Sequence, residues 1–375
     1  MNFLSIEKAF DEATSQGVFP GAVVLVSKEN EVLFERAFGY RSLVPAKTPM
    51  RLETIFDLAS LTKPLATALA AMLLVREKKL RLDDRVTRFF PTFGVFGKHS
   101  VTFRQLLNHT SGLPSWRPYY ETIIKDEKSG KINFVASRAA KNFVFEQIHR
   151  EKSATPAGAE CQYSDLGFMI LGEVIEAIGG RALDIYCHEK IFKPLGLRST
   201  SFVDLTQLRT GRFVPIEQMI APTENCPWRK KILCGEVHDD NAYAMGGVAG
   251  HAGLFSSVHD LHLLLACLAR CYIGKDEFLP QSLMEEFLSR DAVAKDGTYA
   301  LGWDTPSRDR SMSGSHFSRR SVGHLGFTGT SVWWDLEKHF YVILLTNRVH
   351  PSRKNDKLRE FRPYVHDLIM KTVFP

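Results

Sequence analysis

One apolar stretch, residues 56–74, constrains the fold of this chain more than any other part of the sequence. It reads FDLASLTKPLATALAAMLL, and its apolar residues would make a helix that is hydrophobic nearly all round and therefore buried. Proline is tolerated in the first turn of a helix but breaks its interior, so Pro64 places the start of this helix near Ser60. Ser60 and Lys63 are then expected to share one face at the mouth of a buried helix.

Ser60 and Lys63 form a candidate catalytic pair. A serine hydroxyl is a poor nucleophile until a neighbouring base takes its proton, and an amine one helical turn away can be that base. The free N–H groups and partial positive charge of a helix N-terminus also stabilise a developing oxyanion and disfavour a protonated lysine. Both effects favour acyl transfer. Because S-x-x-K occurs by chance in many chains, this interpretation requires partner residues elsewhere in the sequence.

Composition sets the frame for these residues. With 375 residues, 44% of them hydrophobic and 24% charged, the chain is expected to be globular, with a sizeable core and two domains or subdomains. Its formal charge of +6 is modest, and the short basic clusters at 229–231 and 319–320 are explained by a solvated surface, so no nucleic-acid partner is predicted.

The N-terminal segment, MNFLSIEKAFDEA, lacks the positive start and long apolar core of a signal peptide, and no run approaches the length of a membrane span. We therefore expect a cytoplasmic protein without a membrane partner, whose six cysteines are reduced thiols. Cys226 and Cys234, with His238 and Asp239 nearby, raise the question of a zinc site, but their spacing matches no tight ligand pattern. Cys267 and Cys271 fall on one helical face, which favours a place in the core. We predict no metal and no cofactor.

The remaining pattern indicates an α/β (α+β) fold, with an antiparallel sheet built from both ends of the chain and a helical region inserted between them. Residues 1–60 and 295–375 would form the sheet domain, residues 61–294 would be mostly helical, and the active site would lie at their junction. The expected strands are 21–27 and 31–39, joined by a turn at 28–30, and 321–329, 331–335 and 340–347. The expected helices, besides the one at Ser60, are 3–16, 131–150, one that begins at Tyr163, 258–272, 280–290 and 355–372. Residues 102–113 are expected to open with a threonine cap, form a short helix and end in a glycine turn.

Four motifs, in this order, resemble those of class C-type serine β-lactamases, DD-peptidases and family VIII carboxylesterases. They are Ser60-Leu-Thr-Lys63, Leu106-Leu-Asn-His-Thr-Ser-Gly-Leu-Pro114, Tyr163-Ser-Asp165 and His324-Leu-Gly326. The resemblance extends over nearly the whole chain, and four ordered motifs are far more specific than one. It implies the β-lactamase/transpeptidase-like fold and a serine hydrolase of the β-lactamase-like superfamily.

The resemblance also implies roles for individual residues. Ser60 would be the acylated nucleophile, Lys63 its proton partner, and Tyr163 the general base that also activates the deacylating water. The oxyanion hole would consist of the backbone N–H groups of Ser60 and Phe327, the residue that follows Gly326. The alternative for Tyr163 is a core tyrosine that tethers a loop.

Two residues depart from the family pattern. Asp165 stands where the family usually has an asparagine; a carboxylate there would favour a charged Lys63, leave Tyr163 as the base, and repel the side-chain carbonyl of a β-lactam. His324 stands where lactamases have a lysine that attracts the substrate's carboxylate. If His324 binds that carboxylate, activity on such substrates should improve below about pH 6.5. The alternative is that His324 only packs against or bonds its strand.

Residues 235–242, together with the glycine-rich segment 246–257, are similar to a branch that includes muropeptide amidases, which cut between the lactyl group of N-acetylmuramic acid and the stem peptide. His238, Asp239 and Asn241 are therefore candidate substrate-binding residues, with a buried loop anchor as the alternative. The second H-x-G, at 251–253, is interpreted as a structural turn. Trp116 is a candidate for stacking on substrate, although packing beneath a loop is an equal alternative.

The predicted function is hydrolysis of an ester or amide through an acyl-enzyme, by a carboxylesterase or peptidase-like enzyme with weak or no lactamase activity. One alternative is an N-acetylmuramoyl-L-alanine amidase acting on muropeptides. Another is a non-hydrolytic binding or scaffold protein on the same fold. The expected partner is a small ester, peptide or muropeptide substrate, and no oligomeric state is predicted.

Overall fold

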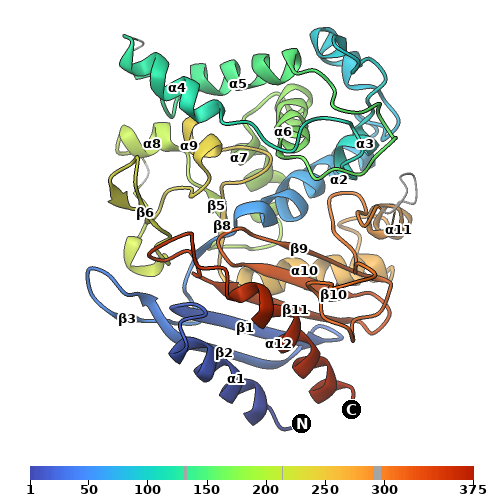
Figure 1. Ribbon diagram of the computed structural model, residues 1–375. Helices are drawn as coiled ribbons and strands as arrows, with labels where there is room; N and C mark the ends of the chain where they lie inside the picture. The colour runs from blue at the N-terminus through green and yellow to red at the C-terminus, as the bar shows by residue number, and fades with distance from the viewer. Residues whose placement is uncertain (131–132, 213, 291–296) are drawn as a thin grey trace.

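A six-stranded antiparallel sheet forms the base of the protein (Figure 1), as seen in a computed structural model that describes residues 1–130, 133–212, 214–290 and 297–375. Within these residues its strand order is β3-β2-β1-β11-β10-β9, so the first and last strands of the chain meet at its centre, where Val24 of β1 pairs with Leu344 of β11. The predicted sheet from both chain ends is confirmed. The sheet strands are β1 Gly21–Lys28, β2 Glu31–Ser42, β3 Thr48–Pro49, β9 Ser321–Leu325, β10 Ser331–Asp335 and β11 Phe340–Thr346.

The first hairpin turns where the sequence predicts it. Glu29 and Asn30 have φ angles of 54° and 69°, which match the two-residue turn that suits the twist of antiparallel strands. Nearly all of β1 is buried on both faces, because helices cover both sides of the sheet.

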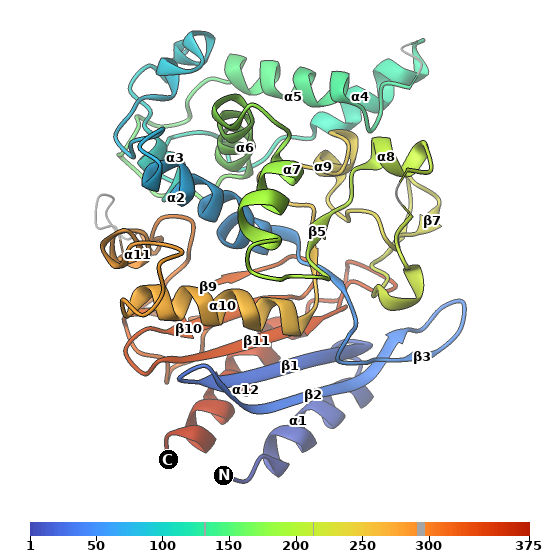
Figure 2. The ribbon, with the colours of Figure 1, turned by 180° about the vertical axis from the view of Figure 1, so that it is seen from behind.

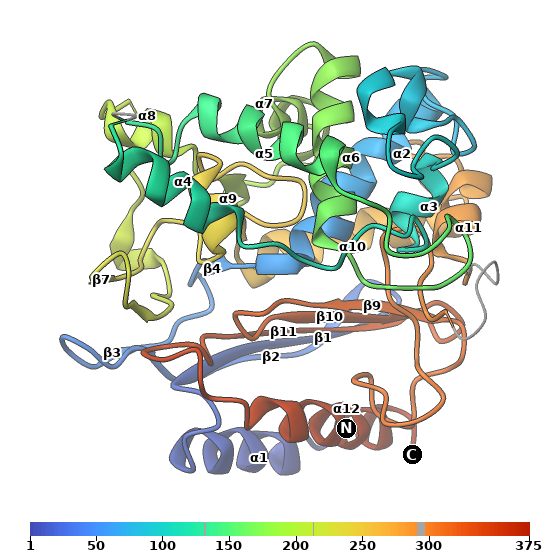
Figure 3. The same cartoon turned by 45° about the horizontal axis from the view of Figure 1, so that its top comes forward.

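Helices α1 (Leu4–Ser15) and α12 (Leu358–Val373) cover one face of the sheet, and α10 (Val258–Tyr272) lies against the other (Figures 2 and 3). Aromatic rings fill the layer beneath the sheet, where Phe10 stacks on Phe38 at a centroid distance of 4.7 Å. The division into residues 1–60 with 295–375 and residues 61–294 stays a prediction. Helix α10 does not follow this division, because it belongs to the central segment 61–294 but packs on the sheet.

The helical region lies beyond α10, around the buried helices α2 (Leu69–Arg76) and α6 (Asp165–Gly179) (Figure 3). A short sheet, β5 (Ser201–Phe202), β8 (Leu254–Ser256) and β4 (Phe56–Asp57), leads from this region toward Ser60, and β6 (Asn225–Cys226) pairs with β7 (Lys231–Ile232). The other helices are α3 Phe103–Leu107, α4 Tyr119–Lys128, α5 Arg138–Arg150, α7 Leu183–Cys187, α8 Leu205–Arg209, α9 Asp240–Ala244 and α11 Gln281–Leu288.

The helix expected to begin at Ser60 is less regular than predicted. Residues Ala59–Leu61 form a 3-10 turn, Lys63–Ala68 form a π-helical turn, and the α-helix starts only at Leu69. In a regular α-helix the ring of Pro64 would clash with the carbonyl group of Ser60, four residues earlier, and the wider π-helical turn avoids that clash. The π-helical turn therefore separates the candidate nucleophile from the regular helix behind it.

The short helix expected within residues 102–113 is present as α3, which begins with a capping box formed by Thr102 and Gln105 and ends at Leu107. The expected glycine turn follows at Gly112, which has a φ of 74°. The helix expected over 131–150 begins at Arg138, and residues 131–132 lie outside the described residues.

One segment, Ala59–Arg76, is long and apolar enough to cross a membrane by length and composition. In the folded protein 83% of it is buried. Its packing in the interior accounts for its apolar composition.

Candidate active site

The backbone leading to Ser60 is held in an unusual conformation. Ala59 has a φ of 47°, which a side chain disfavours, so the surrounding contacts must hold it. Asp57 on β4 provides them: its carboxylate accepts hydrogen bonds from the N–H of Ala59 at 2.8 Å and from the N–H of His238 at 2.6 Å. Sequence reasoning assigned no role to Asp57, because its second partner is 181 residues away in the chain.

Lys63 makes three polar contacts in the protein interior. Its Nζ lies 2.9 Å from Ser60 Oγ, 3.0 Å from the carbonyl oxygen of His251 and 2.7 Å from Asp165 Oδ1, and its side chain is fully buried. Burial lowers the pKa of Lys63 below its ordinary value, and the charge of Asp165 opposes this by raising it. Ser60 is partly exposed, so its hydroxyl lies between a buried amine and the solvent.

Tyr163 completes the trio expected from the sequence. It lies two residues before α6, whose N-cap is Ser164, and its phenol is close enough to the Ser60 side chain for Ser60 to lower the pKa of Tyr163. Lys63 Nζ lies 4.9 Å from the centre of the Tyr163 ring. The structure therefore brings Ser60, Lys63 and Tyr163 together from two separate segments of the chain.

Burial and the charge of Asp165 raise the pKa of Tyr163 well above its ordinary value of 10.0, although its bond with Ser60 lowers it. At neutral pH a phenol rather than a phenolate faces Ser60. The ion pair with Asp165 is present and favours the charged form of Lys63, as expected, while burial acts in the opposite direction and lowers the pKa of Lys63 overall. The role of Tyr163 as the general base stays a prediction.

The turn between β9 and β10 is fastened to the strand that carries Ser60. Thr328 and Thr330 donate side-chain hydrogen bonds to the backbone carbonyls of Asp57 and Leu58, at 2.7 and 3.0 Å. A Cβ on Gly326 would lie 2.4 Å from the carbonyl oxygen of Leu58, so only glycine fits this close approach. The turn thus brings Gly326 against Leu58, two residues before Ser60, and the oxyanion hole formed by the N–H groups of Ser60 and Phe327 stays a prediction.

His324 is buried on β9 and close to the trio, with its ring 6.0 Å from that of Tyr163. Its Nδ1 donates to the Leu325 carbonyl at 2.9 Å. Burial and the charge of Lys63 lower the pKa of His324 to about 3. The imidazole is therefore neutral at pH 6.5, which corrects the expectation that activity on carboxylate-bearing substrates improves below that pH.

His238 and Asp239 lie at the edge of the site. The His238 ring is buried and stacks on Phe327 at 5.5 Å, while Asp239 caps α9 and bonds His251 Nε2 at 2.9 Å. The charge of His251 and these bonds outweigh burial and hold the pKa of Asp239 below its ordinary value. Their predicted contact with substrate stays a prediction, but Asn241 is a buried loop anchor that bonds the backbone of Arg117 and Tyr120.

The turn at 251–253 has a second function that sequence reasoning missed. It connects to β8 as a structural turn should, but the His251 carbonyl oxygen also accepts a hydrogen bond from Lys63. A carbonyl gives no sequence signal, so only the folded chain reveals this contact.

Trp116 lies on the loop that precedes α4 and is 43% exposed. The loop approaches the site through a hydrogen bond from the N–H of Asp165 to the carbonyl of Ser115 at 2.9 Å. The Trp116 ring lies 6.5 Å from that of Tyr120, which in turn lies 5.7 Å from Trp228. Its stacking on a substrate stays a prediction.

His109 is a supporting residue within a quoted motif to which the sequence analysis gave no role. Its Nδ1 accepts a hydrogen bond from the N–H of Ser164 at 3.0 Å, and its ring lies 4.6 Å from that of Tyr163. Burial lowers the pKa of His109 well below its ordinary value, and Lys63 lowers it further. A neutral His109 thus fixes the backbone and ring of Tyr163.

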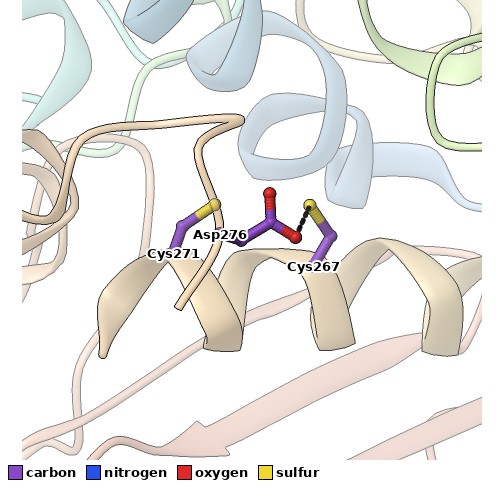
Figure 4. Close-up of side chains that lie close together, drawn as sticks. All are labelled: Cys267, Cys271 and Asp276. Atoms are coloured by element: carbon purple, nitrogen blue, oxygen red, sulfur yellow. Dashed lines mark hydrogen bonds between the residues drawn. The ribbon is translucent and has the colours of Figure 1, made fainter. Parts of the chain in front are cut away.

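Cys267 and Cys271 of α10 and Asp276 lie close together on the side of α10 that faces away from the sheet (Figure 4), with candidate ligand atoms within 4.8 Å of one another. Both cysteines are buried, as their helical spacing predicts. Arg270 Nε bonds the Asp276 carboxylate at 3.1 Å, and this neighbouring positive charge disfavours a bound cation. The absence of a metal cofactor stays a prediction.

Comparisons with known proteins identify the family of the chain. Residues 6–364 match the family model described as beta-lactamase. The chain is 33% identical over 358 residues to the N-acetylmuramyl-L-alanine amidase of Bacillus subtilis, covering 88% of this chain and 78% of that protein. It is 32% identical to a putative D-alanyl-D-alanine carboxypeptidase of Salmonella typhimurium, covering 91% and 81% of the two chains.

Solved structures show the same fold. A penicillin-binding protein homologue from Pyrococcus abyssi has a TM-score of 0.72 and 23% identity, covering 99% of this chain and 78% of that one. EstCE1, a hydrolase with promiscuous acyltransferase activity, has a TM-score of 0.69 and 22% identity, covering 96% and 97%. The expected β-lactamase/transpeptidase-like fold is confirmed, and the chain belongs to the beta-lactamase family.

Proposed function

We propose that the protein is a serine hydrolase that cleaves an amide through an acyl-enzyme on Ser60. The observation that carries this proposal is the convergence of two proton-transfer groups on one serine: Lys63 Nζ lies 2.9 Å from Ser60 Oγ and 4.9 Å from the centre of the Tyr163 ring, and the Ser60 side chain lowers the pKa of Tyr163. A serine between a buried amine and a phenol can lose its proton to one and have its leaving group protonated by the other.

We assign the first proton transfer to Lys63, because burial lowers its pKa and so favours the amine form, and the second to Tyr163, because burial raises its pKa and keeps the phenol protonated. In acylation, the amine form of Lys63 accepts the Ser60 proton as the oxygen attacks the carbonyl carbon. Tyr163 donates its proton to the departing amine and becomes a phenolate beside the new ammonium. In deacylation the phenolate takes a proton from water, hydroxide attacks the acyl group, and Lys63 returns its proton to Ser60 as the acid leaves.

The developing oxyanion would be bound by the backbone N–H groups of Ser60 and Phe327. The fastening of the β9–β10 turn to Asp57 and Leu58 supports this role, because fixed donors need no reorganisation as the charge develops.

The preferred substrate is the amide between an N-acetylmuramyl group and L-alanine. The 33% identical relative with this name supports it, and so does the neutral His324. In a peptide linked through L-alanine, the residue after the scissile bond continues into the chain and carries no free carboxylate there. A neutral imidazole at His324 suits that bond, whereas an adjacent carboxylate would call for a cation.

A D-alanyl-D-alanine carboxypeptidase is the second candidate, supported by relatives at 32% identity. Its scissile bond lies next to a terminal carboxylate. The neutral His324 offers that carboxylate no positive charge to pair with. Ester hydrolysis, expected from the sequence, would use the same acyl-enzyme. The cytoplasmic location stays a prediction.

The nucleophile is tested with a fluorescent phosphonate probe. Wild-type protein and Ser5→Ala, which changes an exposed serine on α1, should be labelled equally, and Ser60→Ala should not be labelled. Labelling of Ser60→Ala would show that Ser60 is not the nucleophile. If a control hydrolase is labelled and the wild-type protein is not, the non-hydrolytic scaffold becomes the better explanation.

The substrate is tested by mass spectrometry of products from three compounds at equal concentration. These are an N-acetylmuramyl-L-alanyl peptide, a peptide ending in D-alanyl-D-alanine, and a short p-nitrophenyl ester. We expect release of a peptide with a new N-terminal L-alanine to exceed release of D-alanine at least tenfold. Faster release of D-alanine would support the carboxypeptidase, and turnover of the ester alone would support the carboxylesterase.

A further inference from the structure

A cavity opens beside the β9–β10 turn, between the end of β9, the loop after β11 and the first turns of α12. Its volume is about 570 Å³, within the range of small-molecule sites in proteins. Apolar side chains make up part of its wall and arginines most of the rest. The lining residues are Met312, Leu325, Gly326, Phe327, Arg348, Arg353, Asp356, Leu358, Arg359 and Arg362.

Arg362 is the unusual residue in this wall. Its side chain comes from α12 and is only 6% exposed, and its Nε is buried without a hydrogen-bond partner. Among the described residues no carboxylate forms an ion pair with it. Burial and the neighbouring Arg348 lower its pKa to about 10, so it remains charged near pH 7. A guanidinium with a buried, unpartnered Nε and no ion pair is costly unless something outside the chain compensates its charge.

The other charged residues around the cavity do not neutralise the positive charge of Arg362. Arg353 is bound by Glu224 and, at 3.2 Å, by Asp240, so its charge is neutralised. Arg348 donates to the backbone carbonyls of Asn355 and Phe327, both at 2.5 Å, and carbonyls carry no compensating charge. The lining contains one acid, Asp356, against the remaining arginines, so its net charge is positive.

We propose that this cavity binds a small organic anion, whose carboxylate or phosphate group pairs with Arg362 and Arg348 and whose apolar part lies against Met312, Leu325 and Leu358. Guanidinium groups match both anions, because their N–H groups pair with two oxygens at once. Water could hydrate Arg362, but it would leave the positive charge uncompensated.

The cavity is connected to the candidate active site through Phe327. The Arg348 guanidinium lies 4.7 Å from the centre of the Phe327 ring and bonds its carbonyl, while His238 stacks on the same ring. An anion that fixes Arg348 therefore also fixes the turn that carries the Phe327 N–H. This consequence rests on the proposed function, whereas binding itself does not.

Binding is measured by isothermal titration calorimetry with inorganic phosphate, in chloride buffer of constant ionic strength. Wild type and Arg198→Met, which removes an exposed arginine outside the cavity, should bind alike. Arg362→Met should weaken binding at least tenfold, since it removes a charged hydrogen-bonding partner. Titration with hexanoate and acetate then tests the apolar wall, and hexanoate should bind more tightly.

Folding of the variant is checked in the absence of phosphate. Arg362→Met should melt no lower than the wild type, because it removes an unpaired buried charge. If it does not fold, Arg362→Lys provides the same test: it keeps the charge, loses the planar fork, and should weaken phosphate binding at least threefold. No phosphate or hexanoate binding by the wild type, or wild-type affinity in the Arg362 variants, would overturn the proposal. Because calorimetry needs no turnover, neither result depends on whether Ser60 is the nucleophile.

Discussion

Replacing Asp165 by asparagine should shift the acid limb of acylation to lower pH. Acylation needs neutral Lys63, and the Asp165 carboxylate, 2.7 Å from its Nζ, stabilises the ammonium form. Removing that charge lowers the pKa of Lys63 further, so the neutral amine persists to lower pH. The direction of the shift therefore follows directly from the ion pair.

The size of the shift follows from the distance. At an effective dielectric constant of about 20, unit charges 2.7 Å apart interact by roughly 6 kcal/mol, or about 4.5 pKa units at 1.36 kcal/mol per unit. This is an upper limit, because asparagine keeps a dipole at the position and the Asp165 side chain is 17% exposed. Opposite charges in direct contact commonly shift a pKa by about 1–3 units, and we expect a shift in that range.

The assay is the rate of Ser60 acylation by a p-nitrophenyl ester as a function of pH, measured in the burst phase. Asp165 also raises the pKa of Tyr163, so the comparison is made in a Tyr163→Phe background, where only Lys63 can move the limb. Glu173→Gln is the matched control. It also removes a carboxylate from α6, but that carboxylate pairs with His149 and not with Lys63. An acid limb that stays in place or rises in Asp165→Asn would refute the assignment of Lys63 as proton acceptor.

Three further outcomes test other parts of the site. Tyr163→Phe should lower kcat for an amide by roughly 10²–10⁴-fold but slow acylation by a p-nitrophenyl ester far less, because the nitrophenolate leaving group needs no proton. Equal losses for the two substrates in stopped-flow assays would contradict the role of Tyr163 as proton donor to the leaving amine. Gly326→Ala should lower kcat by roughly 10²–10³-fold, because its Cβ would lie 2.4 Å from a backbone oxygen, whereas Gly167→Ala, with its nearest contact at 3.6 Å, should keep activity. Hydrogen bonds from Arg353 outweigh burial and hold the pKa of Glu224 at about 2, below its ordinary value of 4.5. The contribution of Glu224 to the stability of the fold should therefore be complete above about pH 5 and be lost as the pH falls toward 2. Thermal melting across that range should show a smaller pH dependence in Glu224→Gln, and an unchanged slope would exclude this contribution.

Local rules explain why much of the fold could be predicted. Helix α10 spans Val258–Tyr272, the range expected from its apolar period, and Ser257 caps it through the N–H of Asp260. The hairpin turn at Glu29 and Asn30 likewise depends on neighbours in the chain. These features are decided by contacts within a few residues, which a sequence pattern displays.

Local rules failed where distant segments meet. The interrupted helix after Ser60 follows from Pro64 against the Ser60 carbonyl, but the positive φ of Ala59 depends on Asp57, which the fold joins to His238. The carbonyl of His251 reaches Lys63 from 188 residues away. Backbone groups carry no residue type, so no motif search could have found that contact.

The sequence by itself determined the order of the strands and helices and the presence of a serine, a lysine and a tyrosine in motifs typical of one family. Only the tertiary structure decided how these groups are protonated, because pKa values depend on burial and on charges that the chain brings from afar. Burial of Lys63 lowers its pKa and shifts the amine toward its neutral form, although Asp165 opposes that shift. Burial and the charge of Asp165 raise the pKa of Tyr163, so its phenol keeps the proton.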